Sequence, residues 1–445
     1  MLAEPILAVL GPDPANRRCR INCYAFQQDA ITSFRGWQYA AFYSPLSEDA
    51  PEPLYIHVAR RPYLQGGEWE VLVFNDYPQT VDDGHNTIQL GICPGDGTIH
   101  LSYDHHCDVL RYRYSTPNLA LTPTDFSWSP SLFTSTLPNL PGLPSSHKPF
   151  HYVTYPRFLP LDSSLLFTLR DGKAGLGNDH LYIYSPSEGG AYEYLGQYLT
   201  GLKSNPYIHG LDYRRGKLHV TWVYRGFVHY EGWDDPNDTK HKQQAGPNGA
   251  ENNHNVCYAF SEDGGRTWKN GDGKIIADLV AGKGETIDNE SEGIVAVKVG
   301  KGRGLTNQEA QAVDWDGGVH VLNRNDVGEE QVFWKHYYRN PETGIWSQQG
   351  IRPIYGSTRG RLAVGREGDL YTILPDAEKK EMRILKSTKQ TGYKVDEEVW
   401  VGKGLTGEPL VDSKRLEDDN VLSLMALADA EQGKGRNVVV LDFQL

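Results

Sequence analysis

Residues 84–106 of this chain read GHNTIQLGICPGDGTIHLSYDHH. Apolar and polar residues alternate on both sides of the PGDG turn, and this period of two is typical of paired β-strands. If the apolar residues of both strands share one face, Ile88 pairs with Tyr103 and Leu90 pairs with Leu101. The stretch therefore predicts a β-hairpin with a defined register.

The same register gathers histidines at one end of the hairpin. It sets His85 opposite His106 and Asn86 opposite His105, where strand gives way to loop. Imidazoles exchange protons near neutral pH, so this end of the hairpin is a candidate site for acid–base chemistry. A pair of hydrogen-bonded structural histidines is the alternative interpretation.

The composition is typical of an all-β protein. Among 445 residues, Gly (47), Pro (26), Tyr (26) and Trp (10) are abundant, and turn residues separate short apolar runs. No apolar stretch is long enough for a membrane span, so we expect no membrane partner. The net charge of −13 disfavours nucleic acid as a partner, although a local arginine cluster can still bind a small anion. The five cysteines cannot all pair, and their spacing matches no zinc framework.

Strand–turn–strand elements recur along the whole chain. They are Trp37–Tyr43, Glu68–Phe74, Thr98–Tyr103, Leu165–Arg170, Lys217–Tyr224, Gly318–Asn323 and Asp369–Leu374. Four strands per blade, at about 40 to 60 residues each, would give seven blades in one domain spanning residues 1–445. The last run, Asn437–Phe443, is expected to be a lone terminal strand that closes the ring against the N-terminal blade. We therefore predict a single seven-bladed β-propeller.

One segment carries a sharper propeller signature. Ser261–Trp268 reads SEDGGRTW, which matches the Asp-box turn (S-x-D-x-G-x-T-W) of bacterial-neuraminidase repeats. The Asp side chain accepts hydrogen bonds within such a turn, Gly permits positive φ, and Trp packs between strands. The motif is structural, and we expect it to lie away from the active site.

Further segments carry a resemblance to a known family. They are Val153–Phe158, Leu165–Gly172, Tyr207–Leu211, His219–Arg225, Asn253–Phe260, Leu305–Glu309 and Asp314–His320. In these motifs the chain, over about residues 20 to 375, resembles the BNR-repeat propeller family that includes ulvan lyases. It is most similar to the fungal branch that acts on gum arabic side chains, the L-rhamnose-α-1,4-D-glucuronate lyases. The resemblance implies a seven-bladed propeller that cleaves a bond at C4 of a uronic acid by β-elimination.

That reaction needs a group that neutralises the C6 carboxylate, a base for the C5 proton and an acid for the departing O4. The resemblance aligns the family's paired histidines with His85 and His105, its tyrosine with Tyr155 and its neutralising arginine with Arg170. His105 is the expected base because a neutral imidazole needs no pKa shift to accept a proton, and Tyr155 is the expected acid. Tyr155 could instead be a blade-core aromatic residue.

Other residues are weaker candidates. Arg170 could instead form a structural ion pair with Asp171 or Asp212. Arg225, Asn86 and Gln308 are candidates for contacts with the sugar or its carboxylate, or for structural roles.

No cofactor is required for the elimination. Related propellers can hold a structural ion, Ca²⁺ or Zn²⁺. His209, His254 and Cys257 are candidate metal ligands, although satisfied core residues are the favoured interpretation. Ca²⁺ would instead use carboxylates and carbonyls around the channel.

The expected substrate is an acidic polysaccharide, the arabinogalactan side chains of gum arabic. Long loops at Thr122–Pro149 and Asp234–Asn253 could wall the site and favour exo action, with release of free rhamnose. The alternatives are an endo-acting ulvan-type lyase, a sialidase-like hydrolase and a non-catalytic sugar-binding propeller. This substrate class predicts an extracellular monomer, although residues 1–10 lack the basic region of a signal peptide.

Overall fold

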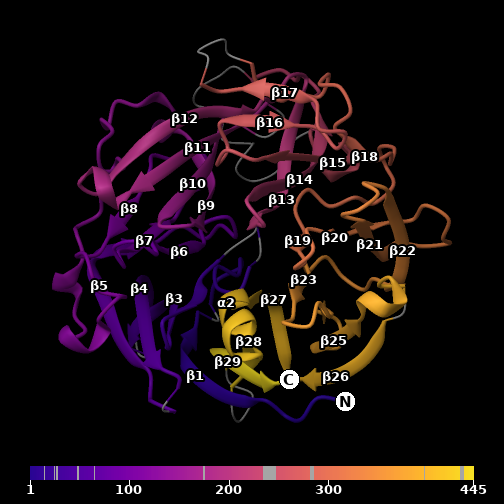
Figure 1. Ribbon diagram of the computed structural model, residues 1–445. Coiled ribbons are helices and arrows are strands. Elements are labelled where there is room, and N and C mark those ends of the chain that lie inside the picture. Colours follow the sequence, from indigo (N-terminus) through magenta and orange to yellow (C-terminus); the bar gives the residue numbers. More distant parts are fainter. Residues whose placement is uncertain are drawn as a thin grey trace.

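The computed structural model describes the whole chain except residues 15, 25, 27–28, 48–49, 65, 174–175, 234–246, 281–284, 395 and 431–434. The chain forms a seven-bladed β-propeller, which confirms the predicted fold class. Seven antiparallel sheets stand around a central axis, and the first strands of neighbouring blades contact one another there (Figure 1). This arrangement brings residues from distant parts of the sequence to the same end of the axis.

The strands of the first three blades have the following bounds. Blade 1 contains β2 (Ile31–Phe34), β3 (Trp37–Ser47), β4 (Ala50–Pro62) and β5 (Glu70–Gln79). Blade 2 contains β6 (Ile88–Ile92), β7 (Ile99–Tyr103) and β8 (Tyr112–Tyr114). Blade 3 contains β9 (Val153–Leu161), β10 (Ser164–Asp171), β11 (Asn178–Ser185) and β12 (Ala191–Leu199).

The next three blades continue around the ring. Blade 4 contains β13 (Ser204–Arg214), β14 (Lys217–Gly226), β15 (Asn253–Ser261), β16 (Thr267–Lys269), β17 (Ile275–Asp278) and β18 (Val295–Val297). Blade 5 contains β19 (Ala310–Val313), β20 (Val319–Asn325), β21 (Phe333–Arg339) and β22 (Trp346–Pro353). Blade 6 contains β23 (Arg361–Val364), β24 (Leu370–Asp376), β25 (Glu381–Ser387) and β26 (Glu397–Lys403).

Blade 7 is built from both ends of the sequence. It contains β27 (Leu405–Val411), β28 (Val421–Asp429), β29 (Arg436–Gln444) and, on its outer edge, β1 (Ile6–Asp13). The last strand is therefore not a lone strand, because β29 pairs with β28 on one side and with β1 on the other. Arg436 also forms an ion pair with Asp13, at 2.7 Å. The ring closes within this blade.

Helical segments are short and lie between strands. They are α2 (Ser413–Asp419) and the 3-10 helices η1 (Pro123–Asp125), η2 (Pro130–Leu132), η3 (Lys148–His151), η4 (Pro186–Glu188), η5 (Ala250–Asn252) and η6 (Lys389–Thr391). Among the described residues no helix is long and apolar enough to cross a membrane. No disulfide joins the five cysteines, all of which the structure describes.

The predicted hairpin register is confirmed. Ile88 pairs with Tyr103 and Leu90 pairs with Leu101 in the β6–β7 ladder. The turn is held by Asp96, whose Oδ1 accepts hydrogen bonds from the N–H and the hydroxyl of Thr98. Every residue of β6 and β7 is buried, because blade 2 is covered by blades on both sides. The hairpin is thus a rigid support for the residues at its open end.

The segment Thr122–Pro149 does not wall the candidate site. Leu137 and Phe133 form bridges to the edge of blade 2, and Trp128 Nε1 donates to the Val58 carbonyl of blade 1. The segment therefore covers the outer edge of the three-stranded blade 2, where unpaired backbone groups would otherwise be exposed. The other predicted wall, Asp234–Asn253, lies outside the described residues over 234–246.

The Asp-box has the predicted structural role. Asp263 accepts four hydrogen bonds within the turn, from the hydroxyls of Ser261 and Thr267 and from the N–H groups of Arg266 and Thr267. Trp268 is fully buried and donates its indole N–H to the Gly265 carbonyl at 2.9 Å. The turn follows β15 at the end opposite to Asn253.

Replacing Asp263 with alanine is expected to lower the free energy of unfolding by roughly 1–3 kcal/mol, because four donors of the turn lose a charged acceptor. Chemical denaturation followed by circular dichroism measures this change. Asp263→Asn keeps part of the acceptor set and should cost less. Equal stability of the wild type and Asp263→Ala would contradict the structural role of the turn.

Candidate active site

The candidate site lies at the face of the propeller where the first strand of a blade begins and its second strand ends. Tyr155 lies near the start of β9, whereas Arg170 lies near the end of β10. His85 and His106 flank the open end of the β6–β7 hairpin. We call His85, His106, Tyr155 and Arg170 the site cluster.

The two histidines of the cluster are stacked. Their ring centroids are 3.8 Å apart and the planes differ by 16°. Asp83 lies beside both rings, and its two carboxylate oxygens each accept a hydrogen bond from an Nδ1–H group, one from His85 and one from His106, both at 2.6 Å. Because the Asp83 carboxylate can only accept hydrogen bonds, the proton of each neutral ring lies on Nδ1 and Nε2 is the basic nitrogen.

Burial is the main reason that His106 is a neutral imidazole. Burial raises the pKa of Asp83, but the hydrogen bonds from His106 and His85 outweigh this effect and hold its pKa well below the usual range. Burial and the neighbouring His85 lower the pKa of His106 to about 4, although Asp83 opposes the shift. At neutral pH, Asp83 is thus ionised and His106 is uncharged.

His105, the predicted base, makes no ring contact with this cluster among the described residues, and its surroundings favour a structural role. Its side chain is buried, with 1% of the residue exposed, and its Nε2 accepts a hydrogen bond from the Arg111 N–H at 2.8 Å. Burial and Arg111 lower its pKa well below the usual value. The predicted alternation fails after Tyr103 because Asp104 has a φ of +63°, which breaks the strand geometry. His106 takes the place that alternation would give to His105.

A β-bulge positions Tyr155. The β9–β10 ladder shifts register between Thr168 and Arg170, and Tyr155 has a φ of +55°. Bulges re-aim side chains, and a bulky residue with positive φ is a strained conformation that concentrates at functional sites. The Tyr155 ring lies 5.8 Å from the His85 ring. Burial raises the pKa of Tyr155 although Arg170 lowers it, so its hydroxyl stays protonated and can donate.

Arg170 is a buried cation with unused donors. Only 2% of the residue is exposed, and its guanidinium lies 4.7 Å from the Tyr155 ring centroid and 5.5 Å from that of Tyr207. Its Nε and Nη1 have no hydrogen-bond partner among the described residues, and Nη2 contacts the Cys107 sulfur at 3.9 Å. No ion pair joins it to Asp171 or another described carboxylate. A buried cation without a carboxylate partner is costly, so this geometry points to an anionic ligand.

The other predicted contact residues divide between the site and its supports. Arg225 lies 4.6 Å over the Tyr207 ring and donates to Asn253 at 2.9 Å, so it adjoins the cluster. Asn86 is buried and donates to Asp104 at 2.7 Å. Gln308 is also buried, and its backbone carbonyl accepts a hydrogen bond from Arg359 Nε.

Several residues near the cluster were not predicted. Phe26 stacks on His85, with centroids 4.3 Å apart, and Arg359 lies 4.5 Å over the Phe26 ring. Four residues therefore reach the cluster from four different segments of the chain: Phe26, Asp83, Tyr207 and Arg359. Only Asp83 had a local signal, because an Asp two residues before His85 can accept its N–H, as the structure shows at 2.9 Å.

The structure does not bring His209, His254 and Cys257 together as a metal site. His209 accepts the Glu309 N–H through Nδ1, and Cys257 lies in the core of blade 4. Among the described residues, the group with ligand atoms within 4.8 Å of one another is Asp83, His85 and His106. One carboxylate and two imidazoles are zinc-type ligands, but a metal there would have to displace both Nδ1 protons.

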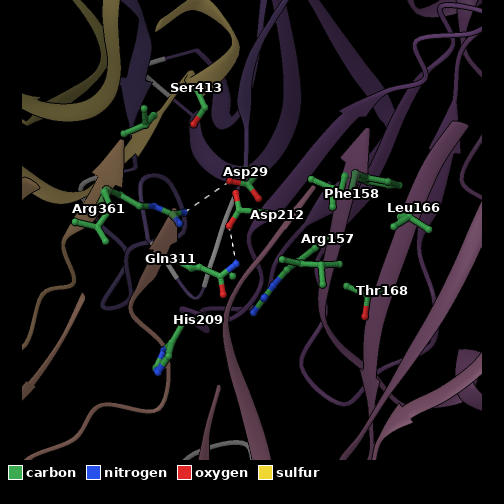
Figure 2. Close-up of a pocket in the computed structure, with 15 residues that line it drawn as sticks. Asp29, Arg157, Phe158, Leu166, Thr168, His209, Asp212, Gln311, Arg361 and Ser413 are labelled. Carbon is green, nitrogen blue, oxygen red and sulfur yellow. Dashed lines mark hydrogen bonds and ion pairs between the residues drawn. The ribbon is translucent and has the colours of Figure 1, made fainter. Parts of the chain in front are cut away.

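A separate cavity lies on the propeller axis (Figure 2). Its volume is about 100 Å³, and its walls carry Asp29, Arg157, Asp212, Gln311 and Arg361. Gln311 donates to Asp212 at 2.7 Å, and Arg361 lies 3.9 Å from Asp29. Ligand pockets usually measure about 300–1,000 Å³, so this cavity is too small for a disaccharide. None of the residues of the site cluster lines it.

Comparisons with known proteins identify the family of the chain. A family model described as "BNR repeat-containing family member" matches residues 37–353. An ulvan lyase (long isoform) of Alteromonas sp. is 28% identical over 344 residues, which cover 65% of this chain and 31% of that protein. One of Pseudoalteromonas sp. (strain PLSV) is 28% identical over 229 residues, covering 44% of this chain and 21% of its own. The chain thus spans less than a third of the length of these curated relatives.

A solved structure supports the fold. The crystal structure of the polysaccharide lyase Uly1 aligns with a TM-score of 0.71 and 17% sequence identity, covering 100% of this chain and 99% of that one. At this level of identity the likeness shows the shared propeller architecture.

Proposed function

The chain belongs to the BNR repeat-containing family, and on this premise we propose that it is a polysaccharide lyase that cleaves a bond at C4 of a uronic acid by β-elimination. The observation that carries the proposal is Arg170, a buried guanidinium with two unused donor atoms beside the Tyr155 ring. A planar, permanently charged fork suits a carboxylate. The likeness to ulvan lyases supports the same reaction class.

In the proposed mechanism, Arg170 binds the C6 carboxylate and stabilises the negative charge that grows there as the C5 proton leaves. Nε2 of His106 accepts that proton, while Asp83 holds the ring and stabilises the imidazolium that forms. The C5–H electron pair forms the C4–C5 double bond, and the C4–O4 bond breaks. The Tyr155 hydroxyl donates a proton to the departing O4. No water is consumed, and Arg170 supplies the positive charge, so no metal cofactor is required.

The proposed substrate is the rhamnosyl-α-1,4-glucuronate end of arabinogalactan side chains, as in gum arabic. The sequence resemblance supports this choice, and so does the net charge of −13, since a long polyanion is repelled by most of the surface. A side-chain end offers a single uronate capped by a neutral sugar. The enzyme would release free L-rhamnose and leave 4,5-unsaturated glucuronate on the polymer. We propose that it acts outside the cell, as a monomer.

The test is incubation with gum arabic and, separately, with ulvan. We expect a rise in near-ultraviolet absorbance from the unsaturated uronate, monomeric rhamnose from gum arabic, and little loss of polymer size. Rapid loss of polymer mass, or activity only on ulvan, would favour an endo-acting ulvan-type lyase. Released sugar without new absorbance would indicate a hydrolase, and binding without turnover would indicate a sugar-binding propeller.

A further inference from the structure

A groove lies on the face of the propeller opposite to the site cluster. It has a volume of about 780 Å³, and its lining includes the β13–β14 turn, the end of β15 and the end of β21. Lys217 lines this groove at the start of β14, whereas Arg225 adjoins the site cluster at the other end of the same strand. Eight residues of strand separate the two sites by about 26 Å. We call this feature the rear groove.

The rear groove is cationic, although the whole chain has a net charge of −13. Five of its lining residues carry a positive charge and two carry a carboxylate: Arg214, Arg215, Lys217, Arg339 and Lys389, against Asp316 and Glu342. A local excess of this kind attracts anions that the rest of the surface repels.

Three of these cations have carboxylate partners. Arg214 pairs with Glu417, Lys217 with Glu262, and Lys389 with Asp316. These ion pairs use part of the positive charge within the protein itself.

Among the described residues, the other two cations have no carboxylate partner and donate hydrogen bonds only to backbone carbonyls. Arg215 donates to the Asp316 carbonyl at 3.3 Å, and Arg339 donates to the Gly271 carbonyl at 3.0 Å. The Nε of Arg339 is buried without a hydrogen-bond partner. Two guanidinium groups therefore remain to bind a carboxylate.

The groove lining also includes four aromatic residues. Tyr258, Phe260, Tyr338 and Tyr393 line it, and the Arg339 guanidinium lies 5.2 Å from the Tyr258 ring centroid. Apolar ring faces under polar and cationic groups suit a sugar, whose C–H face packs on rings while its hydroxyl and carboxylate groups are hydrogen-bonded.

Arg215 occupies an unusual backbone position. Arg214 pairs with Lys217, so Arg215 and Gly216 form a two-residue turn, with φ values of +53° and +74°. Such turns favour Asn-Gly, because both positions need positive φ. Arg215 is therefore a costlier choice for the turn than Asn, and its long cationic side chain lies at the rear groove.

We propose that the rear groove is a second carbohydrate-binding site, which holds the carboxylate of a uronate residue between Arg215 and Arg339. It would keep an acidic, branched polysaccharide bound while the site cluster processes chain ends. The identity of the polymer rests on the proposed function, but the uronate chemistry of the groove does not.

The test is affinity electrophoresis in native gels that contain gum arabic, with the retardation of the protein as the readout. Arg215→Asn is compared with the unchanged groove, and both proteins also carry His106→Gln so that the polysaccharide is not cleaved. Asn suits the turn, so this variant should fold normally. Loss of a charged hydrogen bond should weaken gel retardation about tenfold. Arg35→Asn is the matched control, because Arg35 and Gly36 form the equivalent β2–β3 turn with φ values of +48° and +83°. It removes the same charge outside the rear groove and should leave retardation unchanged.

Arg339→Gln provides a second variant, and its melting temperature shows whether it is folded. Carboxyl-reduced gum arabic should retard the wild type and Arg215→Asn equally. Equal retardation of Arg215→Asn and Arg35→Asn by untreated gum arabic would overturn the rear groove as a binding site. Rhamnose release by the wild type is measured separately. Absence of rhamnose release would contradict the proposed lyase activity without contradicting the rear groove, and loss of the retardation difference would contradict the rear groove without contradicting the lyase activity.

Discussion

Replacing His106 with glutamine is expected to lower kcat/KM for rhamnosyl-glucuronate ends by about 10²- to 10⁴-fold, the usual contribution of a general acid–base group. Glutamine can still donate a hydrogen bond to Asp83, which His106 contacts at 2.6 Å, but it cannot accept the C5 proton. Initial rates of near-ultraviolet absorbance measure the effect. Circular dichroism confirms that the variant is folded.

His105→Gln is the matched control for this experiment. The amide oxygen of glutamine can accept the Arg111 N–H that His105 accepts in the structure. Because His105 makes no ring contact with the site cluster among the described residues, activity per folded molecule should stay within a few-fold of the wild type. If His105→Gln lost as much activity as His106→Gln, the assignment of the base to His106 would be wrong.

The second large effect is expected for Arg170→Lys, although the charge is kept. Lysine has no planar fork, so it cannot hold the carboxylate through two parallel hydrogen bonds. Charge on the carboxylate grows in the transition state, so kcat should fall more than 10²-fold while KM changes little. Steady-state kinetics on gum arabic separate the two parameters. Unchanged kcat with a raised KM would make Arg170 a substrate-binding residue only.

Arg225→Lys is the comparison for this substitution. Arg225 already donates to Asn253 and to the Asn248 carbonyl, so fewer of its donors are available to substrate. We expect a loss below about tenfold, mainly in KM, as for an interaction made equally in ground and transition states. A larger loss in kcat for Arg225→Lys than for Arg170→Lys would reverse their roles.

The fold could be predicted largely because its signals are local. Alternation around the PGDG turn determined the β6–β7 register, and the Asp-box residues make their hydrogen bonds within one turn. The contribution of β1 to blade 7 has no such signal. A pairing between the two ends of a chain leaves no periodic pattern near either end. The sequence therefore predicts that the last strand closes the ring, but not that it shares one blade with β28 and β1.

The site was less predictable for two physical reasons. The first is backbone geometry. Alternation could not reveal that Asp104 leaves the strand conformation, with a φ of +63°, so that His106 rather than His105 stacks on His85. The second is distance in sequence, because Phe26, Tyr207 and Arg359 reach the cluster from other blades. A resemblance to a family supplied Tyr155 and Arg170, which spacing alone would not have distinguished from core residues.

The closing blade also has a consequence for biosynthesis. Asp13 must find Arg436, which lies 423 positions later in the chain. At roughly 5–20 residues per second, the ribosome needs tens of seconds to deliver the partner of β1. Throughout that interval the first strand is an unpaired sheet edge with exposed backbone groups, ready to join any other strand it meets. Six blades can assemble during translation, whereas the seventh forms only after the final strand leaves the exit tunnel.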